Sequence, residues 1–219
     1  MSDKLEKISN LRELLQGKFG SSQNFAPALD EAPGIQVDCL DQITSLKRGT
    51  VSEMIAEQGA PGLGWLIEQL IQSPSGKTGL ALIDGRDSFD PPLTLTENEH
   101  FLWVRCRHVG EAIKAGDWLL RDGNLPMVIL DLQLNPVQEL RRIPSSSWYR
   151  LRALAEETGT TLFAFTPEKL IPCPARRFRF QTFLPLSMLD EPRENIRISP
   201  TLENAKPITS TRDILTQTG

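Results

Sequence analysis

The sequence predicts an α/β domain with a mostly parallel β-sheet flanked by helices. Short, nearly continuous apolar runs alternate with amphipathic segments over most of the chain. Strands that are apolar on both faces are typical of a parallel sheet with helices on both sides. Hydrophobic residues make up 39% of the 219 residues and charged residues 24%, which is the balance of a globular protein.

Residues 1–20 are expected to form a helical arm ahead of this domain. Apolar side chains recur at helical spacing until Gly17 and Gly20 end the pattern, at Leu5, Ile8, Leu11, Leu14 and Leu15. We expect this narrow stripe to dock on the chain's own domain or on a neighbouring molecule. Residues 21–34 are rich in Ser, Asn, Pro and Gly, which predicts a linker, so the core domain is expected at 35–189.

Strands and helices are expected to alternate through this core. The strands are expected at 50–57, 78–84, 101–105, 127–132 and 160–166, with 178–186 as a candidate edge strand, and the helices at 65–73, 110–121 and 148–158. Trp148, Leu151, Leu154 and Ala155 form one helical stripe, which we interpret as core. Residues 190–219 are polar and punctuated by prolines, so an extended or mobile tail is expected there.

The few cysteines and histidines argue against several kinds of site. Cys39, Cys106 and Cys173 lie far apart, without a CxxC pair, which argues against a disulfide framework and a thiolate zinc site. His100 and His108 are the only histidines, so no metal site is expected. No apolar run approaches the roughly 18–20 residues that span a bilayer, and the N-terminus lacks the apolar stretch of a secretory signal. We therefore expect a cytoplasmic protein without membrane contact.

The formal net charge of −4 conceals an uneven distribution. Residues 1–100 carry 8 Lys and Arg against 15 Asp and Glu, residues 101–180 carry 12 against 8, and residues 181–219 carry 4 against 5. The middle segment is therefore basic within an acidic chain. Such a segment is compatible with an anionic partner.

Residues 75–78 read Ser-Gly-Lys-Thr, which imitates the end of a Walker A phosphate loop. That motif requires another glycine five positions before Gly76, where Ile71 stands. It also requires a strand before it and a helix after it, so that backbone N–H groups meet the phosphates. The expected order here is the reverse. We interpret this tetrapeptide as a turn with Lys77 in solvent.

A second glycine-rich segment has the position of a phosphate loop without its polar side chains. Gly59, Gly62 and Gly64 lie between the first core strand and the first core helix, in the GxxxxG frame. Trp65 stands where a lysine would reach the phosphates, and Leu66 stands where a hydroxyl would bind Mg²⁺. An indole carries no charge, and a leucine offers no ligand to a hard cation. Two interpretations follow, an ordinary glycine-rich turn or a degenerate nucleotide site.

The chain resembles a RecA-type recombinase core along most of its length. LRELLQGKFGSS is similar to the recombinase arm, and GIQVDCLDQI with LKRGTVSEMIAEQGAPGLG is similar to the segment leading into the phosphate loop. LALIDGRDSFDP looks like the second strand and its acidic loop, MVILDL like the Walker B strand, and SWYRLRALAEETGTTLFAFTP like the helix and strand that end in the polar sensor. The resemblance implies a RecA-like fold.

The same resemblance indicates which catalytic groups are missing. Asp131 matches the Walker B acid, but Arg86 matches the glutamate that orients the attacking water. Thr166 and Pro167 replace the polar sensor residues. Together with the missing lysine and hydroxyl, these changes remove the positioning and charge stabilisation that drive phosphoryl transfer. We therefore expect a pseudo-ATPase without catalytic residues, cofactor or metal.

Two branches of the RecA superfamily without ATPase activity fit this pattern. The first contains the translesion-synthesis-associated protein ImuA, whose degenerate Gly/Pro-rich loop and helix–strand run are similar. The retained arm favours this branch and implies an adaptor in the bacterial SOS response that contacts the RecA recombinase or translesion polymerase components, with self-association through the N-terminal helix. The second branch, SulA-like, implies a division inhibitor that binds the tubulin-like division GTPase. A third hypothesis is an ATPase with an altered phosphate loop.

The segment 131–147 occupies the region where recombinases place a DNA-contacting loop. It contains Arg141 and Arg142, and it is punctuated by Pro136 and Pro144 rather than rich in glycine. We treat direct DNA contact there as a hypothesis.

The segment PARRFRF at 174–180 alternates basic and aromatic residues. In a strand this places Arg177 and Arg179 on one face and Phe178 and Phe180 on the other. With Arg176, these cations are candidates for a single-stranded nucleic-acid groove or an acidic partner site. The same alternation is typical of an amphipathic edge strand with a solvated basic face.

Overall fold

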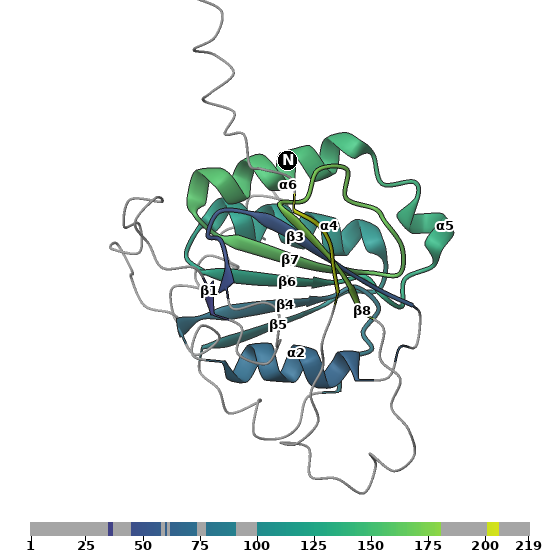
Figure 1. Cartoon of the computed structure of the whole chain (residues 1–219), viewed down its shortest axis with the longest axis horizontal. Coiled ribbons are helices and arrows are strands. Elements are labelled where there is room, and N and C mark those ends of the chain that lie inside the picture. Colours follow the sequence, from purple (N-terminus) through teal and green to yellow (C-terminus); the bar gives the residue numbers. More distant parts are fainter. Residues whose placement is uncertain are drawn as a thin grey trace, which may run out of the picture.

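A mostly parallel sheet forms the centre of the molecule (Figure 1). The computed structural model describes residues 35–36, 45–57, 60, 62–73, 78–90, 100–180 and 201–205. The strands of the sheet are β3 (Val51–Ala56), β4 (Leu80–Asp84), β5 (Phe101–Arg105), β6 (Met127–Asp131), β7 (Thr161–Thr166), β8 (Arg176–Phe180) and β9 (Thr201–Ala205). They are ordered β5-β4-β6-β7-β3-β8-β9, and only β9 runs antiparallel to its neighbour. The short strands β1 (Ile35–Gln36) and β2 (Ser45–Leu46) pair separately.

Helices cover both faces of this sheet (Figure 1). Helix α2 (Leu63–Gln72) lies on one face, and α4 (Val109–Asp122) and α6 (Ser145–Thr158) lie on the other, with the short α5 (Val137–Leu140) near them. Both long helices α4 and α6 end at a glycine in the left-handed conformation, Gly123 at φ 68° and Gly159 at φ 75°. Glycine adopts this conformation at little cost, so it ends helices efficiently.

Two apolar layers fill the spaces between the sheet and the helices. On the α2 side, Leu66 and Leu70 pack with Phe163 and Phe165 of β7. On the α4/α6 side, buried side chains of the two helices pack on the alternate residues of the same strands, among them Ala112, Leu119, Trp148, Leu151, Ala155, Ile83, Val128 and Leu130. The predicted α6 stripe is therefore confirmed as core. Strands buried on both faces explain why their sequences are continuously apolar.

The predicted α/β class and the five core strands are confirmed. Two differences concern the end of the sheet. The strand expected at 178–186 begins earlier, at Arg176, and it is not the edge, because β9 pairs with it. Residues 201–205 fall in the range expected to be a tail, yet they form β9 and cover the otherwise unpaired side of β8.

One further difference concerns the connection after β6, and three other predictions lie outside the described residues. The segment 131–147, compared above with a DNA-contacting loop, contains α5. The predicted arm at 1–20 and linker at 21–34 lie outside the described residues, as does Lys77 of the Ser-Gly-Lys-Thr turn. Within the described part of the chain, no helix is long and apolar enough to cross a membrane.

The parallel order brings the carboxyl ends of the central strands together at one edge. Asp84 at the end of β4 is in register with Asp131 at the end of β6, and Ile55 near the end of β3 is in register with Thr166 at the end of β7. Ligand sites of open α/β sheets lie outside this edge. The ends of β3, β4, β6 and β7, which come from four separate parts of the sequence, therefore lie next to one another at this edge of the sheet.

Candidate functional site

The turn from β3 enters α2 through a glycine in the left-handed region, and the helix start is uncapped. Gly62 precedes the helix with φ 90°, a conformation that favours glycine. An added Cβ at Gly64 would meet no atom within 4 Å. The first turn of α2 carries no acidic residue and no side-chain cap, so its N–H groups retain their partial positive charge. Gly59 lies outside the described residues.

The two side chains at the phosphate-contacting positions belong to the apolar layer. Leu66 is 0% exposed and packs in the core beneath the sheet. Trp65 is partly buried and packs against the same cluster. Neither side chain can neutralise a phosphate or coordinate Mg²⁺. The residues present therefore do not fit a magnesium–nucleotide complex of the usual kind.

Asp84, at the end of β4, is used to build its own loop. Its buried carboxylate accepts hydrogen bonds from the backbone N–H groups of Arg86 (3.2 Å), Ser88 (2.8 Å) and Phe89 (2.8 Å). Arg86, which stands at the matching glutamate position, is exposed and donates to the carbonyl oxygen of Arg107 at 3.3 Å. A cation at this position cannot act as the base that activates a water molecule.

Asp131 is the retained acid, at the end of β6. Burial raises the pKa of its carboxyl group from 3.8 to about 6, and the nearby Asp84 charge adds to this, although a hydrogen bond from the Gln133 backbone N–H opposes it. Its carboxylate is therefore a poorer ligand at mildly acidic pH than an ordinary aspartate. The raised pKa depends on burial at this edge of the folded sheet, so it could not be predicted from the sequence.

Two amides after β6 tie the neighbouring strand ends together. The Gln133 side chain donates to the Glu57 carbonyl oxygen at 2.6 Å, and the Asn135 side chain donates to the Gly85 carbonyl oxygen at 2.8 Å. A Cβ at Gly85 would lie 2.4 Å from the Asn135 side-chain oxygen and 2.6 Å from the Asp131 carbonyl oxygen, so glycine is required there. The sequence analysis missed both amides, and only their position shortly after the Walker B-like strand pointed to them.

Thr166, at the end of β7, contacts an acid that the sequence analysis also missed. Its hydroxyl donates to Glu53 of β3 at 3.1 Å. The Glu53 side chain is 0% exposed and also accepts from the backbone N–H groups of Leu170 (2.8 Å) and Ile171 (3.1 Å) and from the Arg177 guanidinium (2.6 Å). The sensor position therefore serves a buried polar network rather than a ligand.

Most of the arginines proposed for a partner or DNA already have carboxylate partners. Arg141 forms a two-fold hydrogen bond with Glu168, and Arg179 pairs with Glu203 of β9 at 2.5 Å. The predicted alternation in β8 is confirmed, since Phe178 and Phe180 are buried while Arg177 and Arg179 share the other face. Arg142 is exposed. Arg176 also interacts with another group of the protein, so it is not a free cation.

The structure does not bring these arginines into one groove with the phosphate-loop turn. Glu53 and Arg177 pack on the α4/α6 face of β3 and β8, whereas α2 covers the opposite face. The arm residues Leu5, Ile8, Leu11 and Leu14 lie outside the described residues. Within the described ranges, no group of three or more His, Cys, Asp or Glu side chains could hold a metal ion.

Comparison with known proteins gives a likeness in structure and none in sequence. No family model and no curated protein matches the chain. Among solved structures, it is similar to the RadB recombinase with a TM-score of 0.51 and 14% identity, over 65% of this chain and 79% of that one. Identity at this level shows the fold alone. The parallel strand order, the helices on both faces and this likeness establish that the chain has a RecA-like α/β fold.

Proposed function

We propose that this chain is a catalytically inactive RecA-like adaptor of the bacterial DNA-damage response. In this proposal it supports error-prone translesion synthesis by contacting recombinase and polymerase components. It works through protein surfaces, and it neither binds nor hydrolyses ATP. The single observation that supports the loss of catalysis best is the burial of Leu66 at the Mg²⁺-binding position.

Phosphoryl transfer depends on positioned charge, and the edge of this sheet offers little of it. A P-loop enzyme needs a lysine for the phosphates, a hydroxyl and a carboxylate for Mg²⁺, and a group that orients the nucleophile. Here Trp65 and Leu66 belong to the core, Arg86 replaces the orienting acid, and Asp84 holds its own loop. Asp131 alone is retained. These replacements together favour a scaffold over an altered ATPase.

A capture experiment tests the adaptor role. The full-length tagged chain is expressed in bacterial cells before and after DNA damage, and its bound proteins are identified by mass spectrometry. Recovery of the recombinase or a translesion polymerase component is expected. Recovery of the division GTPase instead would contradict the proposal and favour the division-inhibitor alternative.

Variants of the N-terminal segment test whether the arm makes the contact. The double substitution Leu11→Ala/Leu14→Ala removes two members of the apolar stripe and is expected to abolish capture. The matched control Glu6→Ala/Glu13→Ala changes charged positions of the same segment and is expected to retain it. Undiminished capture by a chain lacking residues 1–20 would show that the arm is not the docking element.

A further inference from the structure

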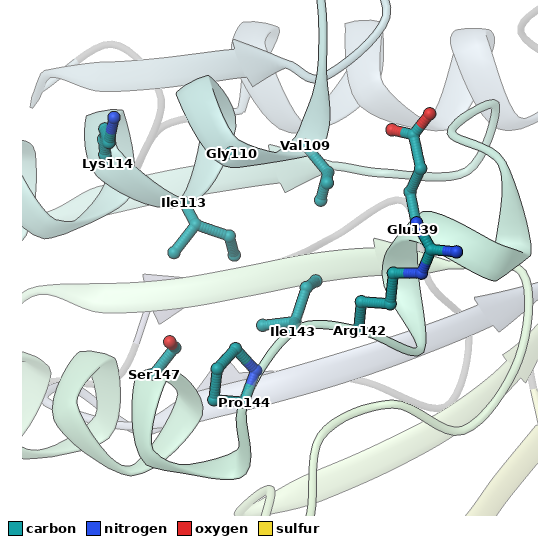
Figure 2. Close-up of a pocket in the computed structure, with 9 residues that line it drawn as sticks. All are labelled: Val109, Gly110, Ile113, Lys114, Glu139, Arg142, Ile143, Pro144 and Ser147. Atoms are coloured by element: carbon teal, nitrogen blue, oxygen red, sulfur yellow. The ribbon is translucent and has the colours of Figure 1, made fainter.

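An open cleft lies between the start of α4 and the segment that joins α5 to α6 (Figure 2). Its volume is about 390 Å³. The lining residues are Val109, Gly110, Ile113 and Lys114 from α4, and Glu139, Arg142, Ile143, Pro144 and Ser147 from the facing segment. The cleft opens on the α4/α6 face, so it is distinct from the phosphate-loop turn before α2.

The base of the cleft is the rim of the hydrophobic core. Val109, Ile113 and Ile143 are partly buried and pack against the apolar layer beneath α4 and α6. In Figure 2 the side chains of Val109 and Ile113 point toward Ile143 across the opening. An apolar side chain entering there would contact aliphatic groups on both walls and would remove them from water, which is favourable.

The walls of the cleft carry two cations that form no ion pair with a described carboxylate, although Lys114 interacts electrostatically with the nearby Glu111. Lys114 and Arg142 are exposed, and no carboxylate of the described residues lies within ion-pair distance of either. Other arginines between 101 and 180 do form ion pairs with carboxylates, namely Arg105, Arg121, Arg141, Arg150, Arg152, Arg177 and Arg179. Glu139 is the acid among the lining residues.

The start of α6 adds to this positive potential. Both α4 and α6 begin at the cleft, with Gly110 in the first turn of one and Ser147 in the first turn of the other. Pro144, the residue just before α6, cannot accept a hydrogen bond through its side chain, so the first N–H groups of α6 have no side-chain cap. The N-terminus of a helix favours negative charge within its first turn. Lys114, Arg142 and the uncapped start of α6 therefore surround an aliphatic base, whereas His108 caps the start of α4 and Glu111 lies in its first turn.

We propose that this cleft binds a short segment of a partner protein in which large apolar side chains lie next to carboxylates. The apolar residues occupy the base formed by Ile113 and Ile143, and the carboxylates meet Lys114 and Arg142. A single-stranded nucleic acid is the poorer occupant, because the lining residues include no aromatic ring on which a base could stack. The inference rests on the proposed adaptor role and names the chemistry of one partner contact.

Fluorescence anisotropy with the full chain tests this assignment. The probe is a labelled hexapeptide with two leucines followed by two aspartates, and the reference probe has two lysines in place of the aspartates. Saturable binding of the acidic probe is expected, with little binding of the basic one. The substitutions Lys114→Gln and Arg142→Gln are each expected to weaken binding about threefold and, together, about tenfold. Ile143→Ser is expected to weaken it by about tenfold or more.

Matched controls separate a cleft effect from general charge or loss of folding. Arg121→Gln removes the same charge at the far end of α4, where Arg121 pairs with Asp117, and should change the affinity less than twofold. Circular dichroism of each variant verifies folding. Equal binding of the acidic and basic probes, or an Arg142-dependent affinity for single-stranded DNA that exceeds that for the acidic peptide, would overturn the proposal. Failure here would leave the capture experiment unaffected, so the two proposals fail separately.

Discussion

Replacing Arg177 by methionine should destabilise the protein strongly, although the sequence suggests a surface cation. The Glu53 side chain is 0% exposed and that of Arg177 is 17% exposed, with 2.6 Å between the guanidinium Nε and the carboxylate. Removing one member of a buried pair leaves the other charge uncompensated, at a cost of about 3–5 kcal/mol. For a domain of this size, that corresponds to a fall in Tm of about 6–20 °C.

Arg179 provides the matched control on the same strand and face. Its pair with Glu203 is more exposed, at 34% and 18% for the two side chains, and Lys169 also contacts Glu203 at 3.1 Å. Arg179→Met should therefore cost only about 0–1 kcal/mol. Urea unfolding followed by tryptophan fluorescence measures both variants. Equal losses for the two, or a loss below about 1 kcal/mol for Arg177→Met, would refute the assignment of Glu53 and Arg177 as a buried structural pair.

Three further predictions concern the pH dependence of stability, the accessibility of the cysteines and the salt dependence of DNA binding. Burial raises the folded pKa of Asp131 from 3.8 to about 6, so the stability that its protonated form contributes is complete below about pH 3.8 and is lost as the pH rises through 6. In thermal unfolding, the Asp131→Asn variant should therefore be more stable than wild type between about pH 4 and 7, by at most about 3 kcal/mol. Cys106 is buried, and burial raises the pKa of its thiol to about 11. Iodoacetamide at pH 8 should therefore label Cys106 only after unfolding, whereas Cys173 should be labelled in the native state, and mass spectrometry distinguishes the two sites. Labelling of Cys106 in the native state would contradict its burial. Arg141, Arg177 and Arg179 are paired with acids, so the affinity for single-stranded DNA, if there is any, should fall less than about tenfold for each tenfold rise in salt concentration. A slope near −2 in a plot of log affinity against log salt, as about three phosphate contacts would give, would contradict this.

The elements that could be predicted from the sequence are those with a local signal. The five core strands are short apolar runs with helices between them, and the α6 stripe has helical spacing, so each is encoded within a window of a few residues. The positions of Asp131 and of the glycine-rich turn also follow locally, since they sit at the ends of recognisable strands. The parallel order then brings them to the same edge, as found.

The polar contacts between distant segments could not be predicted in this way. Glu53 and Arg177 lie 124 positions apart, and nothing near either residue indicates the other. Taken alone, the alternating segment 176–180 resembles an edge strand, and only its pairing with β9 makes it internal. Residues 201–205 carry mixed polar and apolar side chains, so their place in the sheet depends on the unpaired backbone of β8 rather than on their own hydrophobicity.

The burial of Leu66 also depends on the tertiary structure. A leucine near the start of an amphipathic helix is expected to face a core, but the sequence does not specify whether the turn before it remains open to a phosphate. In the structure Leu66 is fully buried, and Trp65 is partly buried against the same apolar cluster. Both residues therefore serve packing in this fold, which is the basis of the pseudo-ATPase proposal.

A nucleotide titration of the purified full-length chain, with and without Mg²⁺, tests this proposal most directly. Isothermal calorimetry with ATP and ADP measures the affinity, and an intact P-loop ATPase measured in parallel verifies the nucleotide and metal. We predict no saturable binding of either nucleotide and no effect of Mg²⁺, because Trp65 and Leu66, rather than a lysine and a hydroxyl residue, directly follow Gly64. Micromolar ATP binding that requires Mg²⁺ would contradict the account and identify the chain as a nucleotide-binding protein with an altered loop.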